Sequence, residues 1–168
     1  AAAGRNPTPV ATGATFPTWN PAGTEIAYVR GRDGLPVNIV IRTLATGVER
    51  EITGPVDFGN GVFIDVDEME PSWSPTGDRI AFTSERPEVM VNLLTGELEV
   101  AAQYEIVTVN IDGTGEQVVS RGDPGSDRAN YLDEDRSPSW SPDGSMVLFM
   151  SQSQAPSCCG PWQVWAVN

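Results

Sequence analysis

The sequence has 168 residues, enough for one compact domain with a hydrophobic core, and it carries a formal net charge of −13. This charge argues against bare nucleic acid and anionic membranes as partners. The chain has no histidine and all ten basic residues are arginine, so it can form no Ser-His-Asp triad, no Schiff-base lysine and no histidine-ligated metal site. No apolar run reaches the ~18 residues that span a bilayer, so we expect no membrane insertion.

Three segments of the sequence share one pattern, and this repeat is the strongest signal in the chain. Each contains a proline, a serine or threonine, a tryptophan and a turn with a second proline and a glycine; they cover residues 17–23, 71–77 and 138–144. The tryptophans, Trp19, Trp73 and Trp140, are 54 and 67 positions apart. Because each turn leads into an apolar alternation, we expect a β-hairpin in every unit.

Each unit continues in chain order with a third apolar run, and the first two units add a fourth after a glycine-containing turn. Four short strands repeated in tandem predict blades of an all-β propeller, with a β-sandwich as the alternative. We expect a single domain over residues 1–168, divided into an N-terminal strand or arm (1–13), blade 1 (14–53), blade 2 (54–120) and blade 3 (121–168), which lacks an outer strand.

The second unit is longer than the first because of an insertion at residues 85–103. Its alternating apolar residues around Thr95-Gly96 predict an extra β-hairpin. The hairpin would either lengthen the blade and cover its rim, or project a partly apolar, acidic tongue toward a partner.

The segment 137–144 (Ser-Pro-Ser-Trp-Ser-Pro-Asp-Gly) and the strand after it resemble the WD40-like (PD40) repeat of TolB-type β-propellers. The second unit matches nearly as well, whereas the first has Asn20 for serine and Ala22 for aspartate. The resemblance covers residues 7–168 and implies an extracellular or periplasmic propeller, usually six- or seven-bladed, that binds proteins, peptides or carbohydrates. Since no separate catalytic domain fits in this length, we expect a binding module and not an enzyme.

Three blades would form an arc and not a closed ring, so each end of the arc would leave an apolar face uncovered. Covering both faces is worth on the order of 10 kcal/mol. We therefore expect other copies of the chain to cover them, as a six-bladed ring of two copies or as a filament, in a structural or adhesive role. The alternative is a fragment of a larger TolB-like periplasmic propeller that docks peptides or proteins, and another protein or a glycan is the alternative partner.

The residues expected to form the assembly contacts lie near the two ends of the chain. The N-terminal stretch would pair as an outer strand with a neighbouring molecule, and the last strand would offer an edge. These residues are Pro7, Thr8, Pro9, Val10, Trp162, Val164, Trp165 and Val167. The motif tryptophans are expected to pack between neighbouring sheets.

Two acidic clusters precede the second and third motifs. Their carboxylates would enter the first strand of a blade at the rim of the central channel, where Ca²⁺ would be the one expected cofactor. The candidate ligands are Asp65, Asp67, Glu68, Asp133 and Asp135. Solvated acidic loops are the alternative, and a carbohydrate-active enzyme that uses such carboxylates is a third function.

The two cysteines of the chain, Cys158 and Cys159, are adjacent in a loop of the third unit. They predict either a vicinal disulfide or two links between chains, and both need the oxidising environment of an exported protein. Two unlinked thiols in a surface loop are the alternative.

Overall fold

The computed structural model describes residues 7–31, 37–57, 61–91, 96, 98–120, 132–154 and 160–168, of which 88–91, 98–102, 132–133 and 153–154 are described by their backbone alone. Every regular element in these ranges is a β-strand. The described part of the chain accordingly holds no helix that is long and apolar enough to cross a membrane.

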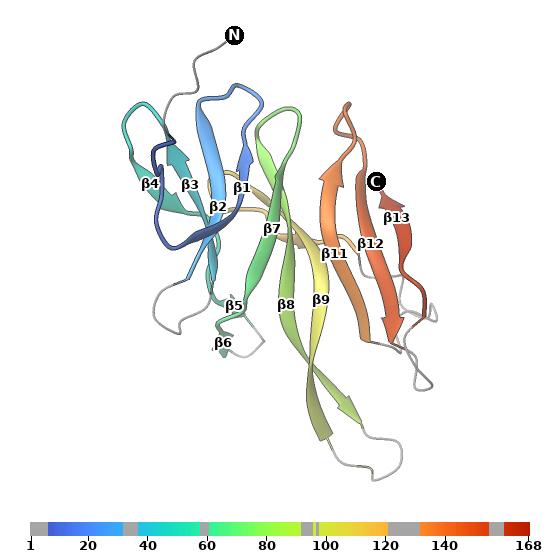
Figure 1. Cartoon of the computed structure of the whole chain (residues 1–168). Coiled ribbons are helices and arrows are strands. Elements are labelled where there is room, and N and C mark those ends of the chain that lie inside the picture. Colours follow the sequence, from blue (N-terminus) through green and yellow to red (C-terminus); the bar gives the residue numbers. More distant parts are fainter. Residues whose placement is uncertain are drawn as a thin grey trace.

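The strands form three successive antiparallel units, side by side, with the first strand of each unit next to that of its neighbour (Figure 1). Blade 1 consists of β1 (Ala14–Trp19), β2 (Glu25–Arg30), β3 (Asn38–Thr43) and β4 (Glu49–Glu51). Blade 2 consists of β7 (Glu68–Trp73), β8 (Arg79–Val91), β9 (Leu98–Asn110) and β10 (Gln117–Val118). Blade 3 consists of β11 (Leu132–Trp140), β12 (Val147–Gln154) and β13 (Gln163–Val167). A short pair, β5 (Val56–Asp57) and β6 (Phe63–Ile64), lies between blades 1 and 2.

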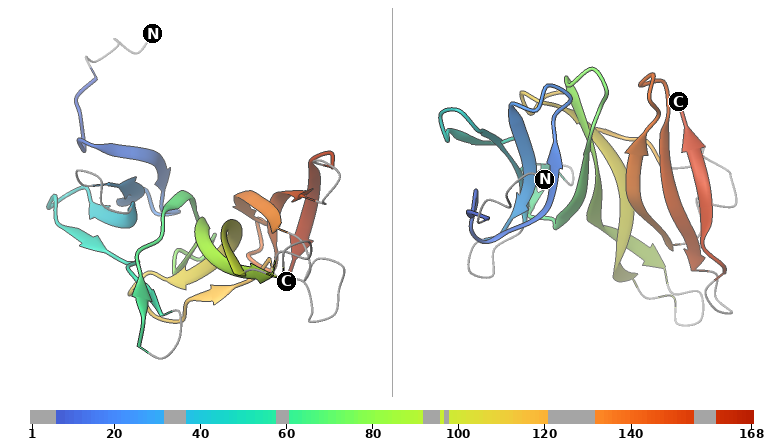
Figure 2. Two further views of the ribbon diagram at one scale, coloured as in Figure 1. Left: turned by 90° about the horizontal axis from the view of Figure 1, so that it is seen from below. Right: turned by 45° about the horizontal axis from the view of Figure 1, so that its top comes forward.

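The three units follow one another along an arc, as the view from below shows (Figure 2). Within each unit the strands pair in chain order, and the single parallel pair Glu134–Tyr104 joins β11 of blade 3 to β9 of blade 2. This architecture confirms the all-β propeller-blade fold expected from the repeats.

The three motif turns have the same backbone. In each, the glycine N–H donates to the backbone carbonyl oxygen of the fourth motif residue. The distance is 3.0 Å from Gly23 to Asn20, 3.0 Å from Gly77 to Ser74 and 2.9 Å from Gly144 to Ser141. All three glycines have a positive φ, which explains why the repeat keeps glycine there.

Asn20 replaces serine in the first motif without a change in the turn. The side-chain hydroxyl oxygens of Ser74 and Ser141 accept hydrogen bonds from the backbone N–H five residues later in the chain, at 3.1 and 2.9 Å. The side-chain Oδ1 of Asn20 accepts the corresponding bond from the backbone N–H of Glu25 at 3.0 Å. A short polar acceptor is therefore what this position requires.

A β-bulge interrupts the first strand of every blade immediately before the motif proline. The bulged residues Phe16, Glu70 and Ser137 have φ values of 51°, 56° and 57°. Non-glycine residues adopt this left-handed region rarely, and its repetition at one position of all three blades marks it as part of the fold.

The insertion in the second unit extends two strands of the same blade. β8 and β9 pair without interruption from Arg79–Asn110 to Val91–Leu98, and Figure 1 shows the resulting hairpin projecting beyond the other blades. Gly96, in the predicted turn, has a φ of 73°.

The hydrophobic core lies between the blades. One cluster joins the β2–β3 residues Ala27, Val29, Ile39 and Ile41 of blade 1 to Trp73, Ile80, Phe82, Val107 and Val109 of blade 2. A second cluster joins Ala81 and Ile106 of blade 2 to Val147 and Phe149 of blade 3. Because side chains alternate between the faces of a strand, each blade uses one face for its predecessor and the other for its successor.

Candidate assembly interface

The contact between two consecutive blades has two different sides. The following blade contributes its motif tryptophan and two alternate apolar residues of its second strand, which are Ile80 and Phe82 in blade 2 and Val147 and Phe149 in blade 3. We call this its back face. The preceding blade contributes the intervening residues, Ala27 and Val29 in blade 1 and Ala81 in blade 2. We call this its front face.

The motif turns make a second contact at the same junctions. A Cβ placed on Gly77 would lie 3.4 Å from Cδ of Pro21, and one placed on Gly144 would lie 3.6 Å from Cδ of Pro75. The second proline of each motif therefore packs on the motif glycine of the next blade, and both internal junctions share this arrangement.

A hydrogen bond strengthens one of the junctions. The Trp140 indole N–H donates to the Ser72 carbonyl oxygen at 3.1 Å, and the Arg79 guanidinium lies 5.8 Å from the Trp140 ring centroid. The indole nitrogen of Trp73 is buried and has no hydrogen-bond partner among the described residues. The two junctions therefore have in common the packing of the tryptophan and not its hydrogen bond.

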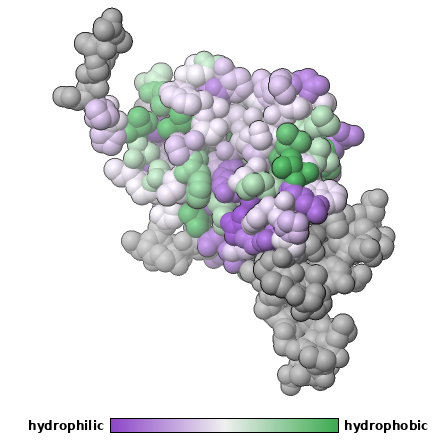
Figure 3. Space-filling view, turned by 45° about the vertical axis from the view of Figure 1, so that its right-hand side comes forward, coloured by the Kyte–Doolittle hydropathy of each residue, from purple (hydrophilic) through white to green (hydrophobic). Residues whose placement is uncertain are grey.

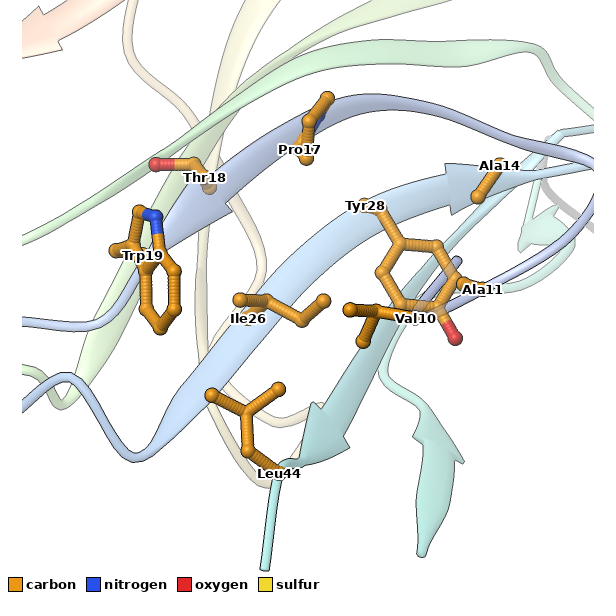
Figure 4. Close-up of a pocket in the computed structure, with 9 residues that line it drawn as sticks. All are labelled: Val10, Ala11, Ala14, Pro17, Thr18, Trp19, Ile26, Tyr28 and Leu44. Carbon is orange, nitrogen blue, oxygen red and sulfur yellow. The ribbon is translucent and has the colours of Figure 1, made fainter. Parts of the chain in front are cut away.

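The back face of blade 1 has no preceding blade in the structure and is partly exposed. Trp73 is 7% exposed at its junction, whereas the equivalent Trp19 is 62% exposed. Beside Trp19 lies a groove of about 350 Å³, lined by residues of β1 and β2, by Leu44 directly after β3, and by the N-terminal segment. Figure 4 shows Trp19 and Leu44 at one end of the groove, Tyr28, Val10 and Ala11 at the other, and Ile26 between them.

The front face of blade 3 is also uncovered. Ala27 and Ala81 are fully buried at the internal junctions, but Leu148, at the equivalent position, is 42% exposed. Its neighbours Met150 and Val164, which pair across β12 and β13, are exposed as well. With blade 3 turned forward, the surface shows a compact apolar group among polar side chains (Figure 3).

Charged side chains flank the groove on blade 1. Glu49 accepts hydrogen bonds from the Tyr28 hydroxyl at 2.7 Å and from Nη1 of Arg42 at 2.6 Å, and it also pairs with Arg30. The hydrogen bonds from Arg30 and Tyr28 lower the pKa of the Glu49 carboxyl group to about 2. Burial and the bond to Glu49 raise the pKa of Tyr28 to about 12.

The residues predicted for assembly divide between the two ends of the arc. Pro7, Thr8, Pro9 and Val10 are exposed in a segment without strand structure, and Val10 lies against blade 1 in the groove. At the other end, Trp162 is exposed, Val164 belongs to the front face of blade 3, and Val167 packs toward blade 2. Trp165 pairs with Phe149, which also faces blade 2.

Sequence reasoning missed Leu148 and Met150 as end-face residues, and its expectation that Trp19 packs between neighbouring sheets is wrong, since Trp19 is exposed on blade 1. An alignment of the three units holds the signal, because Leu148 and Met150 stand where the other blades have Ala27 and Val29, or Ala81 and Thr83. Large apolar residues at positions that elsewhere hold small ones mark a face with a different partner.

The predicted calcium ligands have different environments. Asp65 and Asp67 are exposed, Glu68 and Asp135 are buried, and the side chain of Asp133 lies outside the described residues. Among the described residues, no three Asp, Glu, His or Cys side chains converge as metal ligands would. The calcium site remains a prediction. Cys158 and Cys159 also lie outside the described residues.

The architecture defines a class, the β-propeller, of which this chain supplies three consecutive blades. Two TolB structures are similar to it. The chain superimposes on TolB from Acinetobacter baumannii with a TM-score of 0.54 and 23% identity, over 91% of this chain and 29% of that one. For putative TolB from Agrobacterium tumefaciens the TM-score is 0.58 and the identity 22%, over 95% and 53% of the two chains.

The same fold occurs in proteins of other kinds. Porphyromonas gingivalis dipeptidyl peptidase 4 matches with a TM-score of 0.51 and 16% identity, over 87% of this chain and 23% of that one. The sequence matches no protein-family model and no curated protein. The chain thus spans about half or less of the solved structures, and the likeness to TolB-type propellers is one of fold.

Proposed function

We propose that this chain is a non-catalytic, exported propeller module that assembles with other copies of itself and has a structural or protein-binding role. One observation carries the proposal: each end of the arc exposes a large apolar residue at a position that is buried at the junction of blades 1 and 2, although Ile26 and Tyr28 on blade 1 are buried under Ala11, Ala14 and Leu44. The two exposed residues are Trp19 and Leu148. Soluble proteins rarely leave large apolar faces uncovered unless these faces bind a partner.

The fold favours binding over catalysis. Propeller blades present broad faces and rims, and the inter-blade clusters consist of residues that pack and do not react. Glu68, a carboxyl group with a raised pKa, is 1% exposed and lies between blades 1 and 2, where no glycan would reach it. This position removes Glu68 from the candidates for a general acid in a carbohydrate-active enzyme.

Size-exclusion chromatography with multi-angle light scattering tests the assembly. At micromolar protein concentrations we expect the chain of 18.0 kDa to form a species of 36.0 kDa (twice 18.0) or of a higher multiple. A stable species of 18.0 kDa at all concentrations would overturn the proposal. A screen for glycan turnover tests the non-catalytic role, and sustained product formation would contradict it.

A second function is favoured by the comparisons. The chain covers 29% and 53% of the two TolB structures, which is consistent with a set of blades from a longer periplasmic propeller that docks peptides or proteins. The intact mass of the native protein distinguishes the two, because a longer chain would supply the neighbouring blades itself.

A further inference from the structure

Each internal junction joins the front face of one blade to the back face of the next, and the two faces differ. The front face provides a motif proline and small side chains, and the back face provides a motif tryptophan and glycine, as in the pair Pro21 and Gly77. A blade therefore has two faces that differ in chemistry and shape. Two front faces or two back faces would not reproduce this contact.

The three-blade arc leaves one face of each kind without a neighbouring blade. On the back face of blade 1, Trp19 is exposed and a Cβ on Gly23 would meet no described atom within 4 Å. On the front face of blade 3, Pro142 occupies the motif position at which Pro21 and Pro75 pack on the motif glycine of the next blade. Ile26 and Tyr28 are buried under Ala11, Ala14 and Leu44. The parts left for a further junction are therefore Trp19 with its groove on blade 1 and the front face of blade 3.

These two parts also complement each other in size. The front face of blade 3 carries Leu148 and Met150 where blade 1 has Ala27 and Val29, so it protrudes further than an internal front face. The back face of blade 1 contains the groove of about 350 Å³ beside Trp19. Long apolar side chains on one end thus match an apolar recess on the other.

We infer that the groove on blade 1 receives Leu148 and Met150 of a second copy, so that copies join head to tail with blade 3 against blade 1. This inference rests on the proposed function and specifies its contact. Two copies joined at both of their ends form a ring with a twofold axis, and the same junction gives a filament if the curvature does not close.

Complementation between two variants tests the junction. Trp19→Glu places a negative charge at the groove on blade 1, and Leu148→Glu places one on the front face of blade 3. Because both residues are exposed in the single chain, we expect the fold to persist. We expect each variant alone to be monomeric where the wild type is assembled, with affinity reduced ~100-fold or more. An equimolar mixture should form a dimer, because the Trp19→Glu chain retains Leu148 and the Leu148→Glu chain retains Trp19.

Phe63→Glu is the matched control. Phe63 is a large apolar residue, 66% exposed, on β6 and outside both end faces, so its replacement should leave the assembly unchanged. Far-UV circular dichroism of the wild-type β-sheet type and a cooperative thermal transition would establish that all three variants fold, while the loss of assembly itself lowers the midpoint of the two end-face variants. Mass-tagged chains identify mixed dimers by native mass spectrometry.

The following outcomes would overturn either the head-to-tail junction or the proposed self-assembly. If Leu148→Glu still dimerises and Trp19→Glu does not, blade 1 pairs with blade 1; the reverse result means that blade 3 pairs with blade 3. Either result, or a mixture that stays monomeric, overturns the head-to-tail junction while self-assembly stands. A monomeric wild type overturns the proposed function itself.

Discussion

The Glu70 carboxylate accepts a hydrogen bond of 2.7 Å from the backbone N–H of Ser137, and the two residues occupy the same position in consecutive blades. Both have a left-handed backbone immediately before the motif proline. Glu70 also accepts a bond of 3.1 Å from the Thr83 hydroxyl. A side chain of one β-bulge thus holds the β-bulge of the next blade, which links local backbone geometry to the packing of blades.

Replacement of Glu70 should loosen the junction between blades 2 and 3. Glu70→Ala removes both hydrogen bonds, which share Oε2 of the carboxylate as acceptor, so we expect a loss of ~1–3 kcal/mol in the free energy of unfolding. Glu70→Gln keeps an amide oxygen as acceptor and should cost less than ~1 kcal/mol. Urea unfolding measures both, and equal losses for the two variants would contradict this role of the carboxylate.

The repeat pattern was sufficient to predict the blades, because a Pro-x-Gly turn between apolar runs fixes a hairpin locally. The turn at Gly77 and the hairpin formed by β8 and β9 are local features of this kind. The exposure of Trp19 was not predictable from its own motif, which is the motif of the buried Trp73. Whether such a tryptophan is buried depends on the neighbouring blade, and the pattern within one unit holds no information about that neighbour.

The acidic residues illustrate the same limit. Asp65, Asp67 and Glu68 form one cluster in the sequence, and the start of β7 at Glu68 divides it between surface and core. Side chains on alternate positions of a strand point to opposite faces, so neighbours in sequence need not be neighbours in space. Whether a run of carboxylates in the sequence can form one set of metal ligands therefore depends on where the strand begins and on which side chains share a face, and only the fold supplies this information.

Gly113 should be more sensitive to replacement than the motif glycine of blade 1. Both have a positive φ, of 84° for Gly113 and 68° for Gly23. A Cβ on Gly113 would lie 3.1 Å from the Ile52 carbonyl oxygen of blade 1, whereas one on Gly23 would meet no described atom within 4 Å.

We expect Gly23→Ala to cost ~1 kcal/mol from the backbone conformation alone, and Gly113→Ala to cost ~1–2 kcal/mol more. Thermal and urea unfolding of the two variants provide the comparison. A difference of zero would show that blades 1 and 2 move apart freely enough to accept the methyl group.

The hydrogen-bonded group around Glu49 should stabilise the protein only above acidic pH. Its pKa is lowered to about 2 in the folded chain by Arg30, Tyr28 and Arg42, from an ordinary value of 4.5. The stabilisation is therefore present above about pH 4.5 and is lost as the pH falls toward 2. Glu49→Gln leaves two guanidinium groups without their counterion and should cost ~1–3 kcal/mol at neutral pH, but little at pH near 2.

Unfolding of wild type and Glu49→Gln across this range measures the effect. Tyr28→Phe is the companion variant, since it removes the 2.7 Å bond to Glu49 and the 2.9 Å bond from Arg30 Nη2 but leaves the pairs of Glu49 with Arg30 and Arg42 in place. It should show a smaller loss with the same dependence on pH. A Glu49→Gln loss that is independent of pH would contradict this account.

Glu68 should have the opposite dependence on pH. Its side chain is 1% exposed at the junction of blades 1 and 2, and neither carboxylate oxygen makes a hydrogen bond of normal geometry with a described residue. Burial raises its pKa to about 8 from 4.5, and the nearby Thr53 hydroxyl offsets this only in part. Glu68 is therefore a neutral acid in the folded chain at pH 7 and an anion in the unfolded chain.

Because the unfolded state releases this proton first, the contribution of Glu68 to stability is fully present below about pH 4.5 and falls until the pH passes about 8. Glu68→Gln has no proton to release, so it should raise the free energy of unfolding at pH 7 by up to ~3 kcal/mol and change it little near pH 4. Urea unfolding of the two proteins at several pH values, with Asp65→Asn as a control at an exposed carboxylate, measures the difference. Parallel stability curves for wild type and Glu68→Gln would show that the buried carboxyl group gains a counterion or a proton donor, and would place blades 1 and 2 in looser contact at this point.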